Sequence, residues 1–359
     1  MLSGIDHLEL WVGNARQAAA FFSSSFGFHV TGYAGPETGL RDVASYVLEQ
    51  GSIRLVVSGA LLADSELAVH VQRHGDGVHS IAFRVDDARE AFRTVLQRGA
   101  IPARPPCTTH DAHGEATLAA IAVYGDTQHV FVDRGGYDGV FLPGYEPIEP
   151  DSHIETPDVG LEAIDHVVAN VEQGTLKSWV DYYEQVFGFS QLRHFDAEQI
   201  HTQYSALAST VMWDHDRVIL PINEPAPGLK RSQIDEFLDA YGSPGVQHIA
   251  LRTDDILRAV RAMRDRGVRF LGVPPEYYTT ARRQHAKLAL PWDDLEELGI
   301  LVDRERHGHL LQIFTEPVAD RPTLFVEIIQ RERATGFGEG NFRALFEAIE
   351  HAQARRGNL

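Results

Sequence analysis

An internal duplication is the feature that most constrains this chain. Residues 77–99 (GVHSIAFRVDDAREAFRTVLQRG) recur in similar form, without a gap, at residues 245–267 (GVQHIALRTDDILRAVRAMRDRG). An Ile-Asp-His triplet and a Phe-Gly-Phe triplet, within residues 5–28, also occur a second time within residues 164–189. A duplicated chain of 359 residues suits two domains of similar fold, each long enough to bury a core.

Each half has the sequence pattern of two similar units, in which a strand and a helix precede several further strands. Residues 5–12 alternate as a strand, Asn14 is a candidate helix cap, and Gly27 is a candidate helix end. The later unit repeats this order, with a strand at residues 78–85, a helix capped by Asp86 or Asp87, and a stop at Gly99. The pattern predicts an α+β fold.

Two segments mark the domain organisation. Prolines alternate with acidic residues across residues 143–157, a composition that keeps a connection extended, so we expect domains at residues 1–154 and 155–359. Near the C-terminus, three glycines in residues 336–340 precede a helix at about residues 340–355. The glycines resemble a hinge, and the alternative is a helix permanently packed on the core.

Composition excludes several classes of function. The 51 acidic against 32 basic residues give a net charge of -19, which argues against nucleic acid as a partner. Cys107 is the single cysteine, so no intrachain disulfide can form and the reducing cytoplasm is the expected location. Early charged residues argue against a signal peptide, and no apolar run approaches the roughly 18 residues that span a membrane.

A candidate metal site emerges when the two halves are compared. His166 and His248 occupy equivalent positions in the duplicated segments, and Glu327 lies in an apolar strand near the chain's end. A carboxylate buried in such a strand needs a partner. Two imidazoles and one carboxylate on one face of an octahedron are typical of non-haem Fe(II) oxygenases, whereas zinc is expected to prefer a more closed tetrahedron.

The first half has an incomplete set of the same residues. Ser80 stands opposite His248, His7 opposite His166, and Asp133 can be aligned with Glu327. We therefore predict that His7 and Asp133 are relics or structural residues, and that the first domain is non-catalytic.

Residues suited to an aromatic ligand surround the proposed site in the sequence. Aromatic side chains could enclose a flat ring, and uncharged polar side chains could bind a phenol or a carboxylate without competing for the metal. The candidates are Phe314, Phe325, Phe337 and Phe342, with Ser205, Asn223, Gln233, Gln247 and Gln312.

Several segments in order resemble the 4-hydroxyphenylpyruvate dioxygenase family, of the vicinal oxygen chelate superfamily. They are residues 164–166, 221–225, 232–235, 245–248, 311–314, 321–331 (RPTLFVEIIQR) and 336–342 (GFGEGNF). The resemblance covers nearly the whole chain. It implies two tandem domains of the glyoxalase/dihydroxybiphenyl dioxygenase type, each a curved half-open barrel of paired βαβββ units, with a C-terminal helix capping the active site.

The resemblance also implies a reaction and roles for residues. Fe(II) bound by His166, His248 and Glu327 would be chelated by the 2-oxo acid of 4-hydroxyphenylpyruvate, which leaves one coordination site for O2. Homogentisate and CO2 would be the products of this tyrosine-catabolic step. Phe314 and Phe342 would flank the ring, and Asn341 would join the polar residues named above in ordering the substrate. The family further implies a homodimer or homotetramer.

Other activities stay open on the same residues. 4-Hydroxymandelate synthase shares the metal and the substrate but hydroxylates the benzylic carbon, and Phe342, where that enzyme looks to have a smaller aliphatic residue, favours homogentisate. A related dioxygenase acting on another aromatic 2-oxo acid is a further alternative, as is a non-catalytic binding protein. The segment Thr279–His285 departs from the family pattern, which leaves the local loop in doubt.

Overall fold

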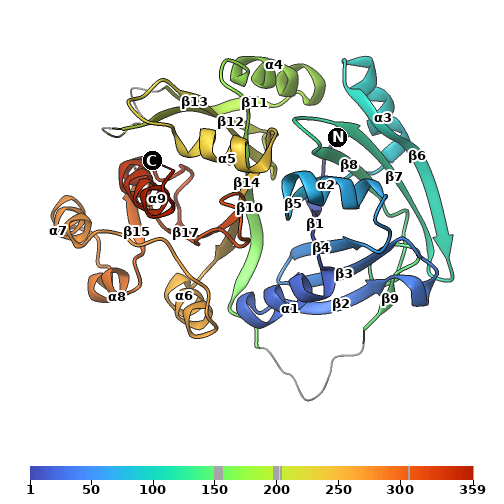
Figure 1. Ribbon diagram of the computed structural model, residues 1–359, viewed down its shortest axis with the longest axis horizontal. Coiled ribbons are helices and arrows are strands. Elements are labelled where there is room, and N and C mark those ends of the chain that lie inside the picture. Colours follow the sequence, from blue (N-terminus) through green and yellow to red (C-terminus); the bar gives the residue numbers. More distant parts are fainter. Residues whose placement is uncertain (149–156, 197–201, 203, 306–307, 359) are drawn as a thin grey trace.

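The computed structural model describes residues 1–148, 157–196, 202, 204–305 and 308–358, without the side chains of residues 339, 342 and 343. The chain forms two large sheets, one from each half of the sequence, placed side by side (Figure 1). The expected domain boundary at residues 154 and 155 lies outside the described residues. Within them, no helix is long and apolar enough to cross a membrane.

The first half forms a sheet with the order β6-β7-β8-β5-β1-β4-β3-β2-β9. Its strands are β1 (Ile5–Trp11), β2 (His29–Ala34), β3 (Val43–Gln50), β4 (Ile53–Ala60), β5 (Gly77–Arg84), β6 (Ile101–Asp111), β7 (Gly114–Ala122), β8 (Gln128–Asp133) and β9 (Glu146–Pro147). β9 pairs with β2, so part of the segment expected to be an extended connection instead extends the sheet edge.

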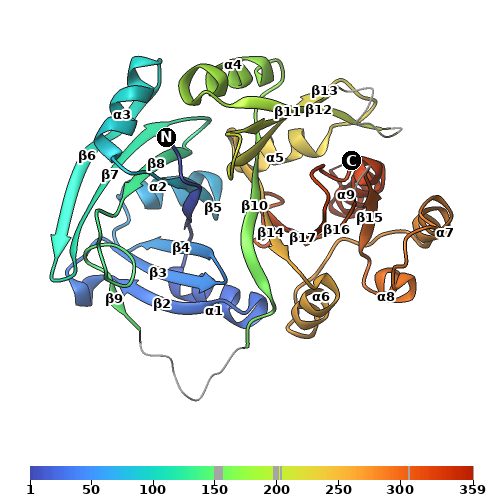
Figure 2. The same ribbon diagram turned by 180° about the vertical axis from the view of Figure 1, so that it is seen from behind.

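The second half forms a sheet with the order β11-β12-β13-β10-β14-β17-β16-β15. Its strands are β10 (Leu161–Asn170), β11 (Ser190–Phe195), β12 (Ala206–Trp213), β13 (Ile219–Ala226), β14 (Gly245–Thr253), β15 (Leu301–Arg304), β16 (His309–Phe314) and β17 (Phe325–Glu332). This sheet curves around the C-terminal helix, which is seen end-on inside it (Figures 1 and 2).

Helices cover the outer faces of the sheets and line the seam between the two halves, and the C-terminal helix lies inside the second sheet (Figure 1). They are α1 (Ala15–Phe26), α2 (Glu66–His74), α3 (Ala88–Gln97), α4 (Leu176–Phe187), α5 (Gln233–Tyr241), α6 (Ile256–Asp265), α7 (Pro275–Gln284), α8 (Trp292–Glu297) and α9 (Phe342–Arg356), with short 3-10 turns η1 (Pro36–Thr38) and η2 (Glu339–Asn341). At the seam, α2 packs on α5 and α3 packs on α4.

Local sequence signals explain where these elements begin and end. The Asn14 side chain accepts a hydrogen bond from the backbone N–H of Gln17 at the start of α1, and Gly27 ends α1 in the left-handed conformation, with φ 74°. Asp87 caps α3 and Asp255 caps α6, the equivalent helix of the second half. These caps confirm the helix starts predicted from the duplicated segments.

The strand order confirms the expected βαβββ units. The first half contains β1-α1-β2-β3-β4 and β5-α3-β6-β7-β8, with α2 between them. The second half contains β10-α4-β11-β12-β13, and then β14-α6-β15-β16-β17 with α7 and α8 inserted. In each sheet the first strands of the two units lie at the centre as an antiparallel pair, β1 with β5 and β10 with β14. Alternate residues on these central strands therefore face the hollow of the half-barrel.

Candidate metal centre

Three adjacent strands bring His166, His248 and Glu327 together. Ala250 on β14 lies opposite His166 of β10 on one side and opposite Glu327 of β17 on the other. His248 is two residues before Ala250, so the alternation of a strand places both on one face of the sheet. The small Ala250 side chain leaves the space between the two longer ones open. The register of the sheet therefore creates the group that no local spacing could.

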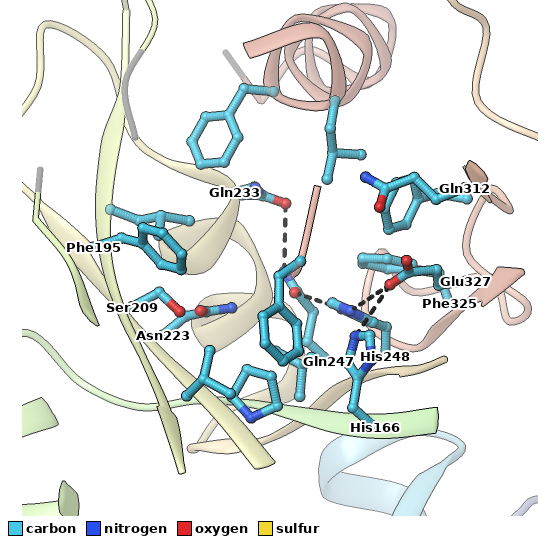
Figure 3. A pocket seen from close by; sticks show the side chains of 18 residues that line it. His166, Phe195, Ser209, Asn223, Gln233, Gln247, His248, Gln312, Phe325 and Glu327 are labelled. Carbon is cyan, nitrogen blue, oxygen red and sulfur yellow. Dashed lines mark hydrogen bonds and ion pairs between the residues drawn. The ribbon is translucent and has the colours of Figure 1, made fainter. Parts of the chain in front are cut away.

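The three side chains converge within a space fit for one cation (Figure 3). The carboxylate Oε2 of Glu327 lies 3.2 Å from Nε2 of His166 and 3.5 Å from Nε2 of His248. All three residues are buried, with exposed fractions of 4%, 9% and 3% for His166, His248 and Glu327. The position is thus enclosed by protein on the side of the sheet.

The other ring nitrogen of each histidine is occupied by an oxygen acceptor from the preceding residue. His166 Nδ1 lies 2.7 Å from Oδ1 of Asp165, and His248 Nδ1 lies 3.2 Å from Oε1 of Gln247. Asp165 is in turn bound by the Arg331 guanidinium at 2.7 Å. Donation from Nδ1 fixes the tautomer in which Nε2 carries the lone pair, as is usual for metal-binding histidines.

The electrostatics of the group favour a cation. Burial alone would raise the pKa of Glu327, but the His166 charge and hydrogen bonds from both imidazoles lower it to about 2. Burial alone would lower the pKa of His166, but the Glu327 carboxylate and Asp165 raise it to about 9. The carboxylate is therefore ionised and needs positive charge beside it, either as protons on the imidazoles or as a metal ion.

The donor set fits a metal ion better than it fits protons. Each ring nitrogen of both imidazoles faces an oxygen acceptor, so without a metal each imidazole would need two protons within a buried site. Burial lowers the pKa of His248, and Glu327 raises it too little to offset this, so a doubly protonated His248 is disfavoured. A divalent cation between the Nε2 atoms and the carboxylate removes the conflict.

A cavity opens beside the group, and the space between its lining atoms, part of it open to solvent, is about 630 Å³. The group lies on one side of it, and Ser209, Asn223 and Phe195 lie on the opposite side (Figure 3). The remaining described lining residues are Val168, Leu207, Val211, Pro221, Gln233, Gln247, Gln312, Phe314, Phe325, Phe337, Leu345 and Phe346. Apart from the histidines and Glu327, none of the described lining residues carries a charge, so an anionic ligand has no lysine or arginine here to pair with.

Most of the substrate residues expected from the sequence line this cavity. They are Asn223, Gln233, Gln247, Gln312, Phe314, Phe325 and Phe337. The Phe325 ring stacks on His248 at 4.8 Å and the Phe337 ring lies edge-on to His166 at 5.5 Å, so these two also wall the metal position. The buried Gln312 Oε1 has no hydrogen-bond partner, which leaves it available to a ligand.

Two expected substrate residues are placed differently, and the side chain of a third is not described. Ser205 donates its hydroxyl to Glu350 of α9 at 2.6 Å, and Asn341 Oδ1 accepts a hydrogen bond from Tyr277 at 2.7 Å. Neither lines the cavity. Phe342 begins α9, but its side chain lies outside the described part of the structure. Ser205 and Asn341 thus fix the helix that covers the cavity rather than the cavity wall.

The sequence reasoning missed one polar residue and several apolar ones. Ser209 lies on β12 between Leu207 and Val211, and all three face the cavity because they alternate along the strand. The alternation is visible in the sequence, but it does not say which face is inward. Phe195, Leu345 and Phe346 come from the edge strand β11 and from α9, which only the fold brings together.

The first half lacks a metal-type side chain at two of the three equivalent positions, not at one. Ser80 pairs with Gln128 and Ala82 with Val130, so Val130 is the structural counterpart of Glu327. The alignment of Asp133 with Glu327 was wrong by three residues, because it matched the Phe-Val pairs that precede the two acids. Asp133 instead accepts the backbone N–H of Gly135 in the turn after β8.

Comparisons with known proteins agree with this architecture. Residues 3–142 match the family described as hydroxyphenylpyruvate dioxygenase, N-terminal, and residues 163–313 match the glyoxalase/bleomycin resistance protein/dioxygenase superfamily. Paired half-barrels with a buried His-His-Glu group define a member of that superfamily.

Curated relatives narrow the class. A 4-hydroxyphenylpyruvate dioxygenase of Dictyostelium discoideum is 47% identical over the full length of both chains, and that of Xenopus tropicalis is 46% identical over 98% of this chain and 92% of its own. The chain belongs to the 4-hydroxyphenylpyruvate dioxygenase family.

Solved structures give the same fold. A variant of 4-hydroxymandelate synthase from Streptomyces coelicolor is 35% identical, with a TM-score of 0.87 over 98% of this chain and 99% of its own. A fusion of a xylose isomerase-like TIM barrel with a 4-hydroxyphenylpyruvate dioxygenase is 23% identical, with a TM-score of 0.76 over 98% of this chain and 53% of its own. The latter similarity concerns the fold alone.

Proposed function

We propose that this chain is an Fe(II)-dependent dioxygenase that converts 4-hydroxyphenylpyruvate and O2 to homogentisate and CO2. The observation that carries the proposal is the buried group His166, His248 and Glu327 facing an uncharged cavity. Three protein ligands on one side leave the cavity side of the metal free for substrate and O2. When bound there, ferrous iron would supply the redox chemistry of oxidative decarboxylation and ring hydroxylation.

The protein's own residues would bind and orient the substrate. Because the described lining offers no cationic side chain, the 2-oxo acid has its one favourable partner at the metal, which directs that end of the molecule toward His166, His248 and Glu327. Ser209 and Asn223 lie across the cavity and would receive the phenol hydroxyl at the far end. Gln233 and Gln312 would add further uncharged donors and acceptors.

Aromatic and aliphatic side chains would keep water away from the reacting atoms. Phe325 and Phe337 contact the two imidazoles, and Leu345 and Phe346 of α9 close the side opposite the sheet. Excluding water strengthens the interactions of the ionised carboxylate with the metal and limits loss of the oxidant to solvent. In this proposal the second domain carries the chemistry, and the first, with Ser80 and Val130 in place of two ligands, does not.

The relatives favour homogentisate over the alternative product. Curated relatives at 42–47% identity are named 4-hydroxyphenylpyruvate dioxygenase, whereas the 4-hydroxymandelate synthase is 35% identical.

The proposal also covers assembly and location. We expect the chain to form a homodimer or a homotetramer, which light scattering would test. We expect it to be located in the reducing cytoplasm, because its exposed Cys107 is unpaired.

The test combines metal binding with product analysis. Anaerobic addition of Fe(II) and 4-hydroxyphenylpyruvate should give a weak visible charge-transfer band, and aerobic turnover should give homogentisate by chromatography. His248→Ala should abolish both, while Ser80→Ala, the same strand position in the first half, should retain both. Turnover by His248→Ala would refute the metal assignment, and hydroxymandelate from the wild-type chain would refute the product.

A substitution at Phe342 tests the choice between the two products separately. Phe342→Ile should shift the product from homogentisate toward hydroxymandelate, because a smaller side chain at that position is expected to change how the ring is presented. An unchanged product ratio with good activity would show that Phe342 does not determine the ring's orientation.

A further inference from the structure

A second cluster of metal-type side chains lies in the first half, away from the cavity. His70 and His74 are one turn apart on α2, so both face the same side of the helix. Asp126 lies in the turn between β7 and β8 and approaches them from the neighbouring strand pair. One ligand atom from each residue lies within 4.8 Å of the others. This group is unrelated to the positions of His166, His248 and Glu327.

The distances suit a shared cation. Oδ2 of Asp126 lies 2.8 Å from Nε2 of His74 and 3.5 Å from Nδ1 of His70. Ligands of a tetrahedral zinc ion, each about 2.0–2.2 Å from the metal, are separated by roughly 3.3 Å, and the two observed separations bracket that value. Modest side-chain rotation would bring all three atoms to bonding distance of one ion.

The hydrogen bonds of His74 point to a missing positive charge. Its Nδ1 lies 2.6 Å from the backbone carbonyl oxygen of Tyr241, and a carbonyl can only accept, so Nδ1 carries a proton. Nε2 then holds the lone pair in a neutral ring, yet it faces the Asp126 carboxylate, which is also an acceptor. A fully buried imidazole between two oxygen acceptors needs either a second proton or a metal ion on its Nε2 side.

His70 supplies an independent indication. Its side chain is only 3% exposed, and its Nδ1, which faces Asp126, has no hydrogen-bond partner. A buried, unpartnered nitrogen is costly unless something binds it.

We propose that His70, His74 and Asp126 bind a Zn²⁺ ion, with water completing the coordination. Two imidazoles and one carboxylate suit zinc, whereas calcium and magnesium prefer sites made of oxygen ligands. The Asp126 side chain is 43% exposed, which gives the ion a path from solvent and leaves room for the water.

The ion would fasten the two halves of the molecule at their seam. The Tyr241 carbonyl that fixes the His74 tautomer belongs to the last residue of α5, the helix that begins with Gln233 at the cavity. Arg321 joins the same seam, because its guanidinium donates to the backbone carbonyls of Gln72, Arg73 and Ala240. Zinc on His74 therefore braces α2 against α5 without contacting the cavity.

Zinc titration of the full-length chain tests the site. Because zinc can also occupy the catalytic group, the titration is made in the background His248→Ala with Glu327→Ala, which leaves that group one ligand. We expect one Zn²⁺ per chain by calorimetry and metal analysis, and a Co²⁺ spectrum of the tetrahedral type. Adding Asp126→Asn should weaken zinc binding at least about tenfold, since it removes a charged ligand at an exposed position.

A matched control variant and the number of zinc ions bound by the wild-type chain complete the test. Asp86→Asn, an exposed aspartate outside the cluster, should leave zinc binding unchanged. In the wild-type chain, freed of metal, two zinc ions should bind, and Asp126→Asn should reduce the count to one. No zinc uptake by the double variant, or equal affinity with and without Asp126, would overturn the proposal and leave a protonated His74 as the partner of Asp126.

Discussion

At the residue scale, each half contains an aspartate that binds both the histidine after it and a distant arginine. In the second half, Asp165 binds the imidazole of His166 and the guanidinium of Arg331, whose Nη1 donates to the carbonyl of Gly336. In the first half, Asp6 binds His7 and Arg134 in the same way, and Arg134 donates to the carbonyl of Phe141. The motif persists in the first half, where Ser80 and Val130 stand at the positions of the proposed ligands His248 and Glu327, so it serves the fold as well as the proposed metal site.

Replacing Asp165 should therefore weaken the metal without removing a ligand. Asp165→Asn leaves His166 without the carboxylate that fixes its tautomer, and we expect Fe(II) affinity to fall about 10–100-fold. Activity should recover at high Fe(II) concentration. Asp6→Asn, the same change in the first half, is the control and should leave Fe(II) affinity unaltered. Equal metal affinity for Asp165→Asn and the wild-type chain would show that this hydrogen bond does not tune the site.

The control variant Asp6→Asn should also show that Asp6 stabilises the first half in a way that depends on pH. Burial alone would raise the pKa of Asp6, but His7 and Arg134 hold it well below its ordinary value of 3.8. The ionised Asp6 therefore contributes stability that is present above pH 4 and is lost as the pH falls toward its folded pKa. At neutral pH, Asp6→Asn should reduce the free energy of unfolding by about 2–4 kcal/mol, since it leaves Arg134 without its partner.

Urea unfolding at a series of pH values measures this effect. The difference in unfolding free energy between Asp6→Asn and the wild-type chain should stay constant from neutral pH to about pH 5 and should narrow as the pH falls from about 4 to 3. A difference that stays constant with pH would mean that the charge of Asp6 is not what stabilises the first half.

The residues that the sequence could identify are those that the duplication marks. His166 and His248 were predicted because each occupies an equivalent position in a repeated segment, and the structure brings both to Glu327. Ser205 and Ser209 differ by four positions on or beside one strand, and only packing decides that Ser209 faces the cavity. The alignment of Asp133 with Glu327 was wrong because Val130, three residues earlier, occupies the equivalent position. Strand pairing determines this register, and local sequence similarity does not reveal it.

At the scale of elements, α9 depends on a few buried polar contacts. Glu350 is 5% exposed and its Oε1 accepts hydrogen bonds from the hydroxyls of Thr202 and Ser205 at 2.5 and 2.6 Å. Near the helix end, Arg356 pairs with Glu236 of α5. Leu345 and Phe346 on the same helix line the cavity. These contacts bind α9 to the segment before β12 and to α5, so they hold α9 over the cavity.

Glu350→Ala should loosen α9 and expose the cavity. The change leaves two hydroxyls without their acceptor, which we expect to cost about 1–3 kcal/mol locally. Amide hydrogen exchange in α9 should rise, and KM for 4-hydroxyphenylpyruvate should rise with it, because the closed cavity becomes less populated. His351→Ala, an exposed position on the same helix, is the control. Unchanged exchange in α9 would show that these contacts do not fasten the helix.

The sequence predicted where helices begin, but it did not predict how helices contact one another. Caps such as Asn14 and Asp87 act locally, so the helix starts could be read from the chain. The unusual segment at residues 279–285 forms the end of α7 and its C-cap, and Arg282 within it pairs with Asp293 and Glu296 of α8. Its departure from the family pattern is thus accommodated by a contact between two inserted helices, which no single-segment pattern reveals.

At the scale of the whole molecule, the two halves share one core. A single cluster of buried side chains runs from Leu8 and Phe83 in the first half to Val180 and Ile328 in the second. The duplication predicted two domains, but not this continuity, because it depends on which helices of one half pack on the other. A shared core implies that neither half unfolds alone, and hence that unfolding is cooperative.

Gln50 makes this coupling testable. Its Oε1 accepts the backbone N–H groups of Val159, Gly160 and Leu161, where the chain enters the second half, and its Nε2 donates to the carbonyl of Phe26. Gln50→Leu keeps the volume but leaves these buried groups unpaired, which should lower the unfolding free energy by about 2–5 kcal/mol. Gln17→Leu, the same change at an exposed position of α1, should have little effect.

Thermal unfolding of both variants and the wild-type chain should show one transition each, with circular dichroism and residual Fe(II)-dependent O2 uptake falling together. For Gln50→Leu that single transition should move to lower temperature without splitting, since the core still joins the halves. Two separated transitions in the wild-type chain would contradict the shared core. Splitting in Gln50→Leu alone would instead place the coupling in the contact between Gln50 and the entry to β10.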